Sequence, residues 1–330
     1  MAQVNPAWPQ AFACHRYQAL ANGPALIVTG AVHGNEVCGA VAIRRVMAEL
    51  EQGMLSLRAG RLTLVPVANP LAYRLGQRGG DRNLNRNLAP NPSPQDYEDH
   101  AANWLCPLLA EHDVLLDLHS FQSPGQPFVF LGPTDNDGEL EPFAHAAREE
   151  ALARRLGVAD AVDGWLSTYA LGVVRRRLSP VGDHRLRELN GDARYGVGTT
   201  EYMRSQGGWA LTLECGQHAD PAAPEVAYRA ILNALAHLGL VDAPDPAPRT
   251  LSLLSLYEVV DKQDDADSFV RGWTSFEIVR KGDLIGRRAD GSPVCAPDDA
   301  RIVFPNPRAQ AGQEWFYLAR TSDRLASRHA

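Results

Sequence analysis

The chain has 330 residues, of which 45% are hydrophobic and 22% charged, as is ordinary for a folded globular protein. Its net charge of −7 supplies no basic surface of the kind that nucleic acid requires, so we expect no nucleic-acid partner. No stretch approaches the ~20 apolar residues of a membrane-spanning helix, and the N-terminus lacks the cationic and apolar regions of a secretory signal. Five scattered cysteines favour a reducing compartment, so we predict a cytoplasmic protein without a membrane partner.

Apolar patterning predicts strands and helices along the first 240 residues. Residues 1–24 contain three prolines and are expected to be irregular. A buried strand over 25–32 precedes a helix over 37–52, whose apolar residues follow a 3.6-residue period. The polar residues 69–96 lack any period and are expected to form a functional loop. Further strands are predicted at 61–67, 114–118, 128–131 and 209–214, and further helices at 97–111, 142–156 and 222–239.

The pattern changes in two later stretches. Residues 160–208 combine a basic run with a glycine-rich piece and form a candidate lid. Residues 242–250 are rich in proline and polar side chains, which is typical of a linker. Short β-like runs separated by glycine and proline follow. We therefore predict two domains, one over 1–245 and a small all-β domain over 250–330.

Ligand-capable side chains occur where predicted strands end. His33 and Glu36 lie three residues apart, directly after the first buried strand. His119 closes the strand VLLDLHS, and Asp117 shares its face because strand neighbours two apart point the same way. Imidazole and carboxylate groups are zinc ligands, and a catalytic zinc usually takes three protein groups plus water. Asp117 would accept the free imidazole N–H of a zinc-bound histidine, or would serve only as a structural partner.

Glu214 ends the strand WALTLE, where an ionisable group is costly to bury unless it serves a site. A glutamate beside a metal can take a proton from water and later deliver it to a leaving amine. The alternative is a structural carboxylate paired with an arginine.

The polar loop carries arginines among asparagines, in the order Arg78, Asn83, Asn85, Arg86 and Asn87. Arginine binds carboxylates through two parallel hydrogen bonds, and asparagine adds neutral donors. A single arginine would by default be a solvated surface residue. The pattern of the whole loop therefore indicates recognition of an anionic substrate.

Four motifs in chain order resemble one known family. They are HGNE at 33–36, NP at 69–70 followed by an arginine and NLNRN at 83–87, DLHS at 117–120, and TLECG at 212–216. Together they are similar to the succinylglutamate desuccinylase/aspartoacylase family, a branch of the zinc-carboxypeptidase-like (M14-type) metallohydrolases. The resemblance covers roughly residues 25–240. It implies an α/β/α sandwich with a mixed central sheet and a small C-terminal β domain that partly covers the site.

The resemblance also implies how the strand-end residues act. One Zn²⁺ per chain would be bound by His33, Glu36 and His119, with a position left for water. Glu214 would be the general base and then the general acid. In the loop, Arg78 would polarise the scissile carbonyl.

The same resemblance assigns Asn85 and Arg86 to the free carboxylate of the substrate. One residue differs from the family pattern, and one family residue has two candidates in this chain. Family members usually have aspartate where this chain has Asn83, which leaves the acyl or amino-acid specificity in doubt. Tyr257 and Tyr317 are two candidates for a tyrosine that the C-terminal domain contributes to the site.

The hypothesis is a zinc-dependent hydrolase that cleaves the amide bond of an N-acyl amino acid, a small-molecule carboxylate substrate. The first alternative is an M14-like carboxypeptidase or amidase that acts on a peptide or cell-wall fragment, because the same residues would serve it. The second is a binding protein that keeps zinc without catalysis. The sequence leaves open the acyl group, the amino acid and whether the chain forms a homo-oligomer.

Overall fold

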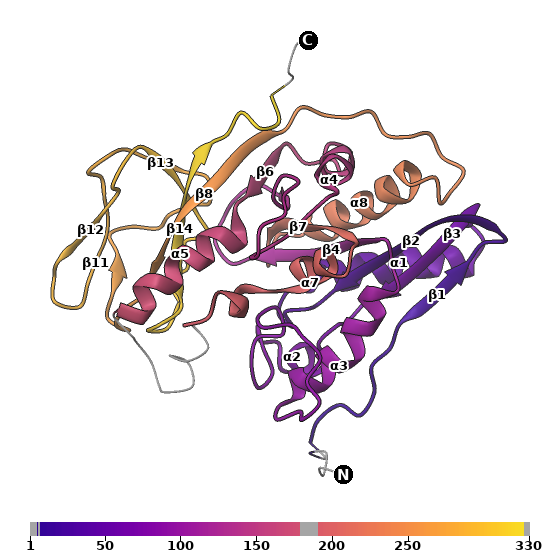
Figure 1. Ribbon diagram of the computed structural model, residues 1–330, viewed down its shortest axis with the longest axis horizontal. Coiled ribbons are helices and arrows are strands. Elements are labelled where there is room, and N and C mark those ends of the chain that lie inside the picture. Colours follow the sequence, from indigo (N-terminus) through magenta and orange to yellow (C-terminus); the bar gives the residue numbers. More distant parts are fainter. Residues whose placement is uncertain (1–4, 6, 179–190, 327–330) are drawn as a thin grey trace.

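A mixed sheet of eleven strands forms the centre of the computed structural model, which describes residues 5, 7–178 and 191–326 (Figure 1). The strands β3, β2, β4 and β7 lie side by side and are parallel. β1 runs antiparallel to β3, whereas β5 is antiparallel to β7 and parallel to β6. The spatial order is β1 (His15–Gln18), β3 (Ala59–Val65), β2 (Ala21–Gly30), β4 (Val114–Phe121), β7 (Trp209–Gln217), β5 (Phe128–Phe130), β6 (Asp160–Asp163), β8 (Ser252–Asp261), β14 (Glu314–Thr321), β13 (Ala300–Val303) and β10 (Ile278–Val279).

Helices cover both faces of this sheet. On β2, Leu26 and Val28 pack into one apolar cluster, and Ile27, which points the other way, packs into a second. The first cluster includes residues of α1 (Cys38–Glu51), α4 (Ala146–Ala153) and α8 (Ala223–His237). The second includes residues of α3 (Tyr97–Ala110) and α7 (Thr199–Ser205). The predicted α/β/α sandwich with a mixed sheet is therefore confirmed.

Two predictions of local structure were wrong, and a third stretch, the candidate lid, contains regular elements while its role stays a prediction. The irregular stretch 1–24 contains β1 and the start of β2, because the polar sequence of an edge strand carries no apolar signal. The loop 69–96 contains the short helix α2 (Pro70–Leu75), in which the Asn69 side chain accepts a hydrogen bond from the backbone N–H of Ala72. The candidate lid 160–208 contains β6, α5 (Trp165–Leu178), a 3₁₀ turn (Ala193–Gly196) and α7, and its residues 179–190 lie outside the described part.

The C-terminal strands extend the central sheet. β8 pairs in parallel with β6, and β14 and β13 follow it at one end of the molecule (Figure 1). β10 pairs with β13 and completes the sheet. A second sheet contains β12 (Pro293–Cys295), β11 (Leu284–Arg287) and β9 (Ser268–Phe269). Its apolar residues join a cluster around Trp315. The division into domains at 1–245 and 250–330 stays a prediction.

Two further observations bear on the sequence predictions. Cys38 and Cys215 are buried, and all five cysteines are free thiols. Among the described residues, no helix combines the length and the apolar character that crossing a membrane requires.

Candidate active site

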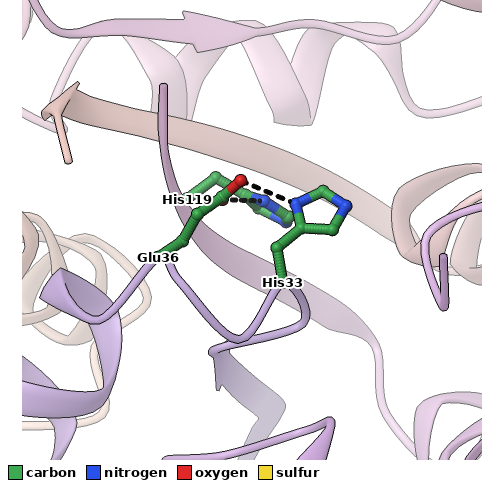
Figure 2. Close-up of side chains that lie close together, drawn as sticks. All are labelled: His33, Glu36 and His119. Atoms are coloured by element: carbon green, nitrogen blue, oxygen red, sulfur yellow. Dashed lines mark hydrogen bonds and ion pairs between the residues drawn. The ribbon is translucent and has the colours of Figure 1, made fainter. Parts of the chain in front are cut away.

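The ends of β2 and β4 bring three ligand-capable side chains together. β2 ends at Gly30, and His33 and Glu36 lie in the turn that leads into α1. His119 lies on β4, the parallel neighbour of β2. The turn is tight, because a Cβ on Gly34 would lie 1.9 Å from the carbonyl carbon of Ala72 in α2. The ligand atoms of His33, Glu36 and His119 lie within 4.8 Å of one another, as Figure 2 shows for their side chains.

The geometry of this cluster suits a divalent cation. All three side chains are at most 3% exposed. One oxygen of Glu36 lies 2.8 Å from His33 Nδ1, and the other lies 2.8 Å from His119 Nδ1 (Figure 2). His33 Nδ1 is nevertheless a buried nitrogen without a properly oriented hydrogen-bond partner among the described residues. Two imidazole nitrogens and one carboxylate form a set of ligands that is typical of a zinc site, and a buried ring nitrogen without a partner is free to bind the ion.

The electrostatics of the two histidines differ. Burial, and next the Arg78 guanidinium, lower the pKa of His33 to about 4, so its ring is neutral as metal binding requires. Burial also acts to lower the pKa of His119, but the carboxylates of Asp117 and Glu36 outweigh it and raise that pKa well above its usual value. The surroundings of His119 therefore favour a positive charge at this point.

Hydrogen bonds behind the histidines fix their orientation. Asp117 is fully buried, and its Oδ2 lies 2.8 Å from His119 Nε2. Asp117 also accepts hydrogen bonds from the hydroxyls of Thr29, at 2.6 Å, and Thr199. Asp117 therefore lies on the same face of β4 as His119, within hydrogen-bond distance of its ring, where it can fix the orientation of the imidazole.

Asn83 lies behind the other histidine, with its Oδ1 3.0 Å from His33 Nε2. The sequence links the change from aspartate to Asn83 with substrate specificity, whereas in the structure Asn83 contacts a candidate metal ligand and accepts a hydrogen bond of 2.9 Å from the backbone N–H of Asn85. Sequence reasoning missed this contact because the loop has no periodicity from which a direction could be inferred.

Glu214 lies on β7, opposite His119 in the parallel register between β4 and β7. Its side chain is 8% exposed and lines the same cavity as the cluster. Oε2 of Glu214 is buried and has no hydrogen-bond partner among the described residues. Burial raises the pKa of Glu214 to about 8. A carboxyl oxygen without a hydrogen-bond partner among the described residues therefore lies in the same cavity as the candidate metal ligands.

The cavity has a volume of about 720 Å³. Its lining includes the carboxyl ends of β4 and β7, the loop 77–86, and residues of the segment 304–314 that leads into β14. Residues of α5 and α7 also line it. This volume lies within the ~300–1,000 Å³ that small-molecule sites usually have.

The loop places Arg78, Asn85 and Arg86 on the cavity wall. Nη1 of Arg78 lies 3.1 Å from Glu36, and about half of the Arg78 side chain is exposed. Oδ1 of Asn85 accepts a hydrogen bond of 2.9 Å from the backbone N–H of Thr199, so this amide also supports the start of α7. Arg86 is buried, and its role depends on contacts that the sequence did not predict.

Nη2 of Arg86 lies 3.2 Å from Glu314, the first residue of β14. The guanidinium also lies 4.8 Å from the centre of the Trp165 ring. Of the two candidate tyrosines, Tyr317 lines the cavity, and its buried hydroxyl has no hydrogen-bond partner among the described residues. Tyr257 packs instead beneath Arg320 and is not among the residues that line the cavity.

His218 is a further cavity residue that sequence reasoning missed. Its Nδ1 lies 2.8 Å from Ser120 Oγ, and Ser120 directly follows His119 on β4. The signal available in the sequence was its place just after the TLECG motif, at the end of a buried strand.

Comparisons with known proteins agree with this architecture. Residues 22–149 match the family model described as the succinylglutamate desuccinylase/aspartoacylase catalytic domain. A succinylglutamate desuccinylase/aspartoacylase structure from Rhodobacter sphaeroides is 19% identical, with a TM-score of 0.69 over 94% of this chain and 90% of that one. The product-bound ectoine utilization protein EutE (DoeB) from Ruegeria pomeroyi is 21% identical, with a TM-score of 0.67 over 93% and 88% of the two chains.

A succinylglutamate desuccinylase from Vibrio cholerae is 18% identical, with a TM-score of 0.67 over 91% of this chain and 82% of that one. A search of curated protein sequences finds no match. At these identities the similar structures establish a shared fold, which extends over nearly the whole chain.

Proposed function

Because this chain belongs to the succinylglutamate desuccinylase/aspartoacylase family, we propose that it is a zinc-dependent hydrolase that cleaves the amide bond of an N-acyl amino acid. One observation carries the proposal: the buried cluster of His33, Glu36 and His119 shares a cavity with Glu214, which has an unpartnered oxygen. The free thiols and the small cavity support a cytoplasmic enzyme with a small-molecule carboxylate substrate.

His33, Glu36 and His119 would hold one Zn²⁺ per chain. When bound, the ion would supply a Lewis acid that polarises the scissile carbonyl and acidifies water in the site. Asp117 would keep His119 in the orientation that presents Nδ1 to the ion. Glu214 would take a proton from the attacking water and deliver it to the amine that leaves.

The arginines would position the substrate and stabilise charge. Arg78 lines the cavity next to Glu36 and would donate hydrogen bonds to the developing oxyanion. Arg86, with Asn85 beside it, would bind the free carboxylate of the amino acid. Tyr317 would offer its unpartnered hydroxyl to the substrate from the C-terminal wall.

Hydrolysis assays with a substrate panel test this function. The purified chain loaded with Zn²⁺ should release free amino acid from N-acetyl and N-succinyl amino acids faster than it releases residues from short peptides. A chelator should abolish this activity, and added Zn²⁺ should restore it. Hydrolysis of peptides alone would point to a carboxypeptidase or amidase, and bound zinc without turnover would point to a binding protein.

Replacing Asp117 by asparagine tests how the site orients its ligands. We expect Asp117→Asn to weaken Zn²⁺ affinity by about 10–100-fold, because the neutral amide holds the His119 imidazole less firmly. Competition with a chromophoric chelator measures this affinity without reference to turnover. Asp113→Asn is the matched control, since Asp113 accepts a hydrogen bond from Ala25 at the opposite end of β4. Equal affinities for the two variants would contradict the assigned role.

A further inference from the structure

The arginine that we assign to the substrate carboxylate already has a carboxylate partner. Arg86 is 7% exposed, and its Nη2 lies 3.2 Å from Glu314 Oε1. About a quarter of the Glu314 side chain is exposed, and it lines the cavity. A substrate carboxylate that binds Arg86 would therefore lie close to a second negative charge.

The neighbouring charges do not relieve this conflict. Asp261 lies opposite Glu314 in the register between β8 and β14 and binds Arg176 through two hydrogen bonds of 2.7 Å. These two arginines and two carboxylates are therefore balanced before a ligand enters. Arg78, which also acts on Glu314, is itself paired with Glu36 at 3.1 Å. Burial would raise the pKa of Glu314, but Arg86 and then Arg176 outweigh it and lower that pKa to about 2. Glu314 therefore keeps its negative charge at neutral pH.

A positive charge on the substrate would restore the balance. Like charges brought together in a poorly solvated site oppose binding, whereas a ligand that carries both signs complements Arg86 and Glu314 together. The Trp165 ring beside Arg86 and the Tyr317 ring on the same cavity wall offer aromatic surface, which also attracts cations.

We propose that Glu314 is a specificity residue, and that the substrate is an N-acyl amino acid with a positively charged side chain. In this arrangement Arg86 binds the α-carboxylate and Glu314 binds the side-chain ammonium or guanidinium group. The proposal rests on the proposed function and names the substrate class within it.

Three Nα-acetyl amino acids of similar length test this proposal: the ornithine, norvaline and glutamate derivatives, whose side chains are cationic, neutral and anionic. We expect kcat/KM for the ornithine derivative to exceed the other two by about 10–100-fold, the range for a hydrogen bond between charged groups. Glu314→Gln should remove this preference, so that the kcat/KM values of the three substrates approach one another. Glu314→Asp, which keeps the charge, should retain the preference. If Glu314 only neutralised Arg86, its loss would change all three rates by the same factor and leave the preference in place.

The matched control is Glu258→Gln, because Glu258 on β8 binds Arg175 and is not among the residues that line the cavity. This variant should leave the substrate preference unchanged. Equal rates for the three substrates, or a preference that survives Glu314→Gln, would overturn the proposal and leave the proposed function intact.

Binding of free ornithine and norvaline, measured by calorimetry, tests the cation subsite separately from the proposed hydrolase function. If no acylated amino acid is hydrolysed, the proposed function fails. Tighter binding of ornithine that depends on Glu314 would still support a cation subsite, and equal binding of the two amino acids would reject it.

Discussion

Glu214→Gln should lower kcat by about 10²–10⁴-fold, the contribution usual for a positioned general acid–base group. The substitution keeps the size of the side chain but removes the carboxylate that would take the proton from water. Oε2 of Glu214 has no hydrogen-bond partner among the described residues, so the variant loses no hydrogen bond of this oxygen to them. Burial raises the pKa of this carboxyl to about 8, and a cation nearby would lower it toward the ionised form that a base requires.

Steady-state kinetics and metal analysis of the same preparation check this prediction. The zinc content should stay near one ion per chain, because His33, Glu36 and His119 are unchanged. Glu111→Gln is a suitable control, since Glu111 lies on the surface just beyond α3 and pairs with Arg16. Near-normal turnover by Glu214→Gln with zinc bound would reject the assigned mechanism.

The convergence of the candidate site was predictable because its residues lie at the ends of strands. β2, β4 and β7 are parallel neighbours, so their carboxyl ends meet at one edge of the sheet. His119 and Glu214 are opposite one another in the register, as two buried strands ending in ionisable groups suggested. The roles that we assign to these residues remain predictions.

Contacts between segments that are far apart in the chain could not be predicted from the sequence. Glu314 is the first residue of the strand EWFYLART and stands just before an apolar run, where a charged residue looks like an ordinary solvent-facing strand end. Its pairing with Arg86, 228 positions away, follows from the extension of the central sheet by β8 and β14. The strand β1 was missed for a related reason, since an edge strand is stabilised by backbone pairing with β3 rather than by apolar side chains.

A buried cluster of charged residues joins α7 to β7 close to the site. Arg204 on α7 is 5% exposed, and its Nε and Nη1 each lie 2.8 Å from a carboxylate oxygen, of Glu149 and Glu141 respectively. Nη2 of Arg204 also donates to the carbonyl of Ala210 on β7. Because α7 begins at Thr199, which binds Asp117, this cluster helps to place the group that orients His119.

Arg204→Met should lower the free energy of unfolding by about 3–5 kcal/mol, because removing one partner leaves a buried charge uncompensated. Glu149 is fully buried and would keep hydrogen bonds only from the backbone N–H groups of Gly132 and Ala210. Urea unfolding measures the loss, and Arg229→Met is the control, since Arg229 forms an exposed pair with Glu225 on α8.

The double variant Arg204→Met/Glu149→Met separates the two causes of instability. Replacing both charges removes the unpaired carboxylate, so it should recover part of the stability that the single variant loses. A single-variant loss below about 1 kcal/mol would contradict the prediction, because an unpaired charge in this interior would cost more than that.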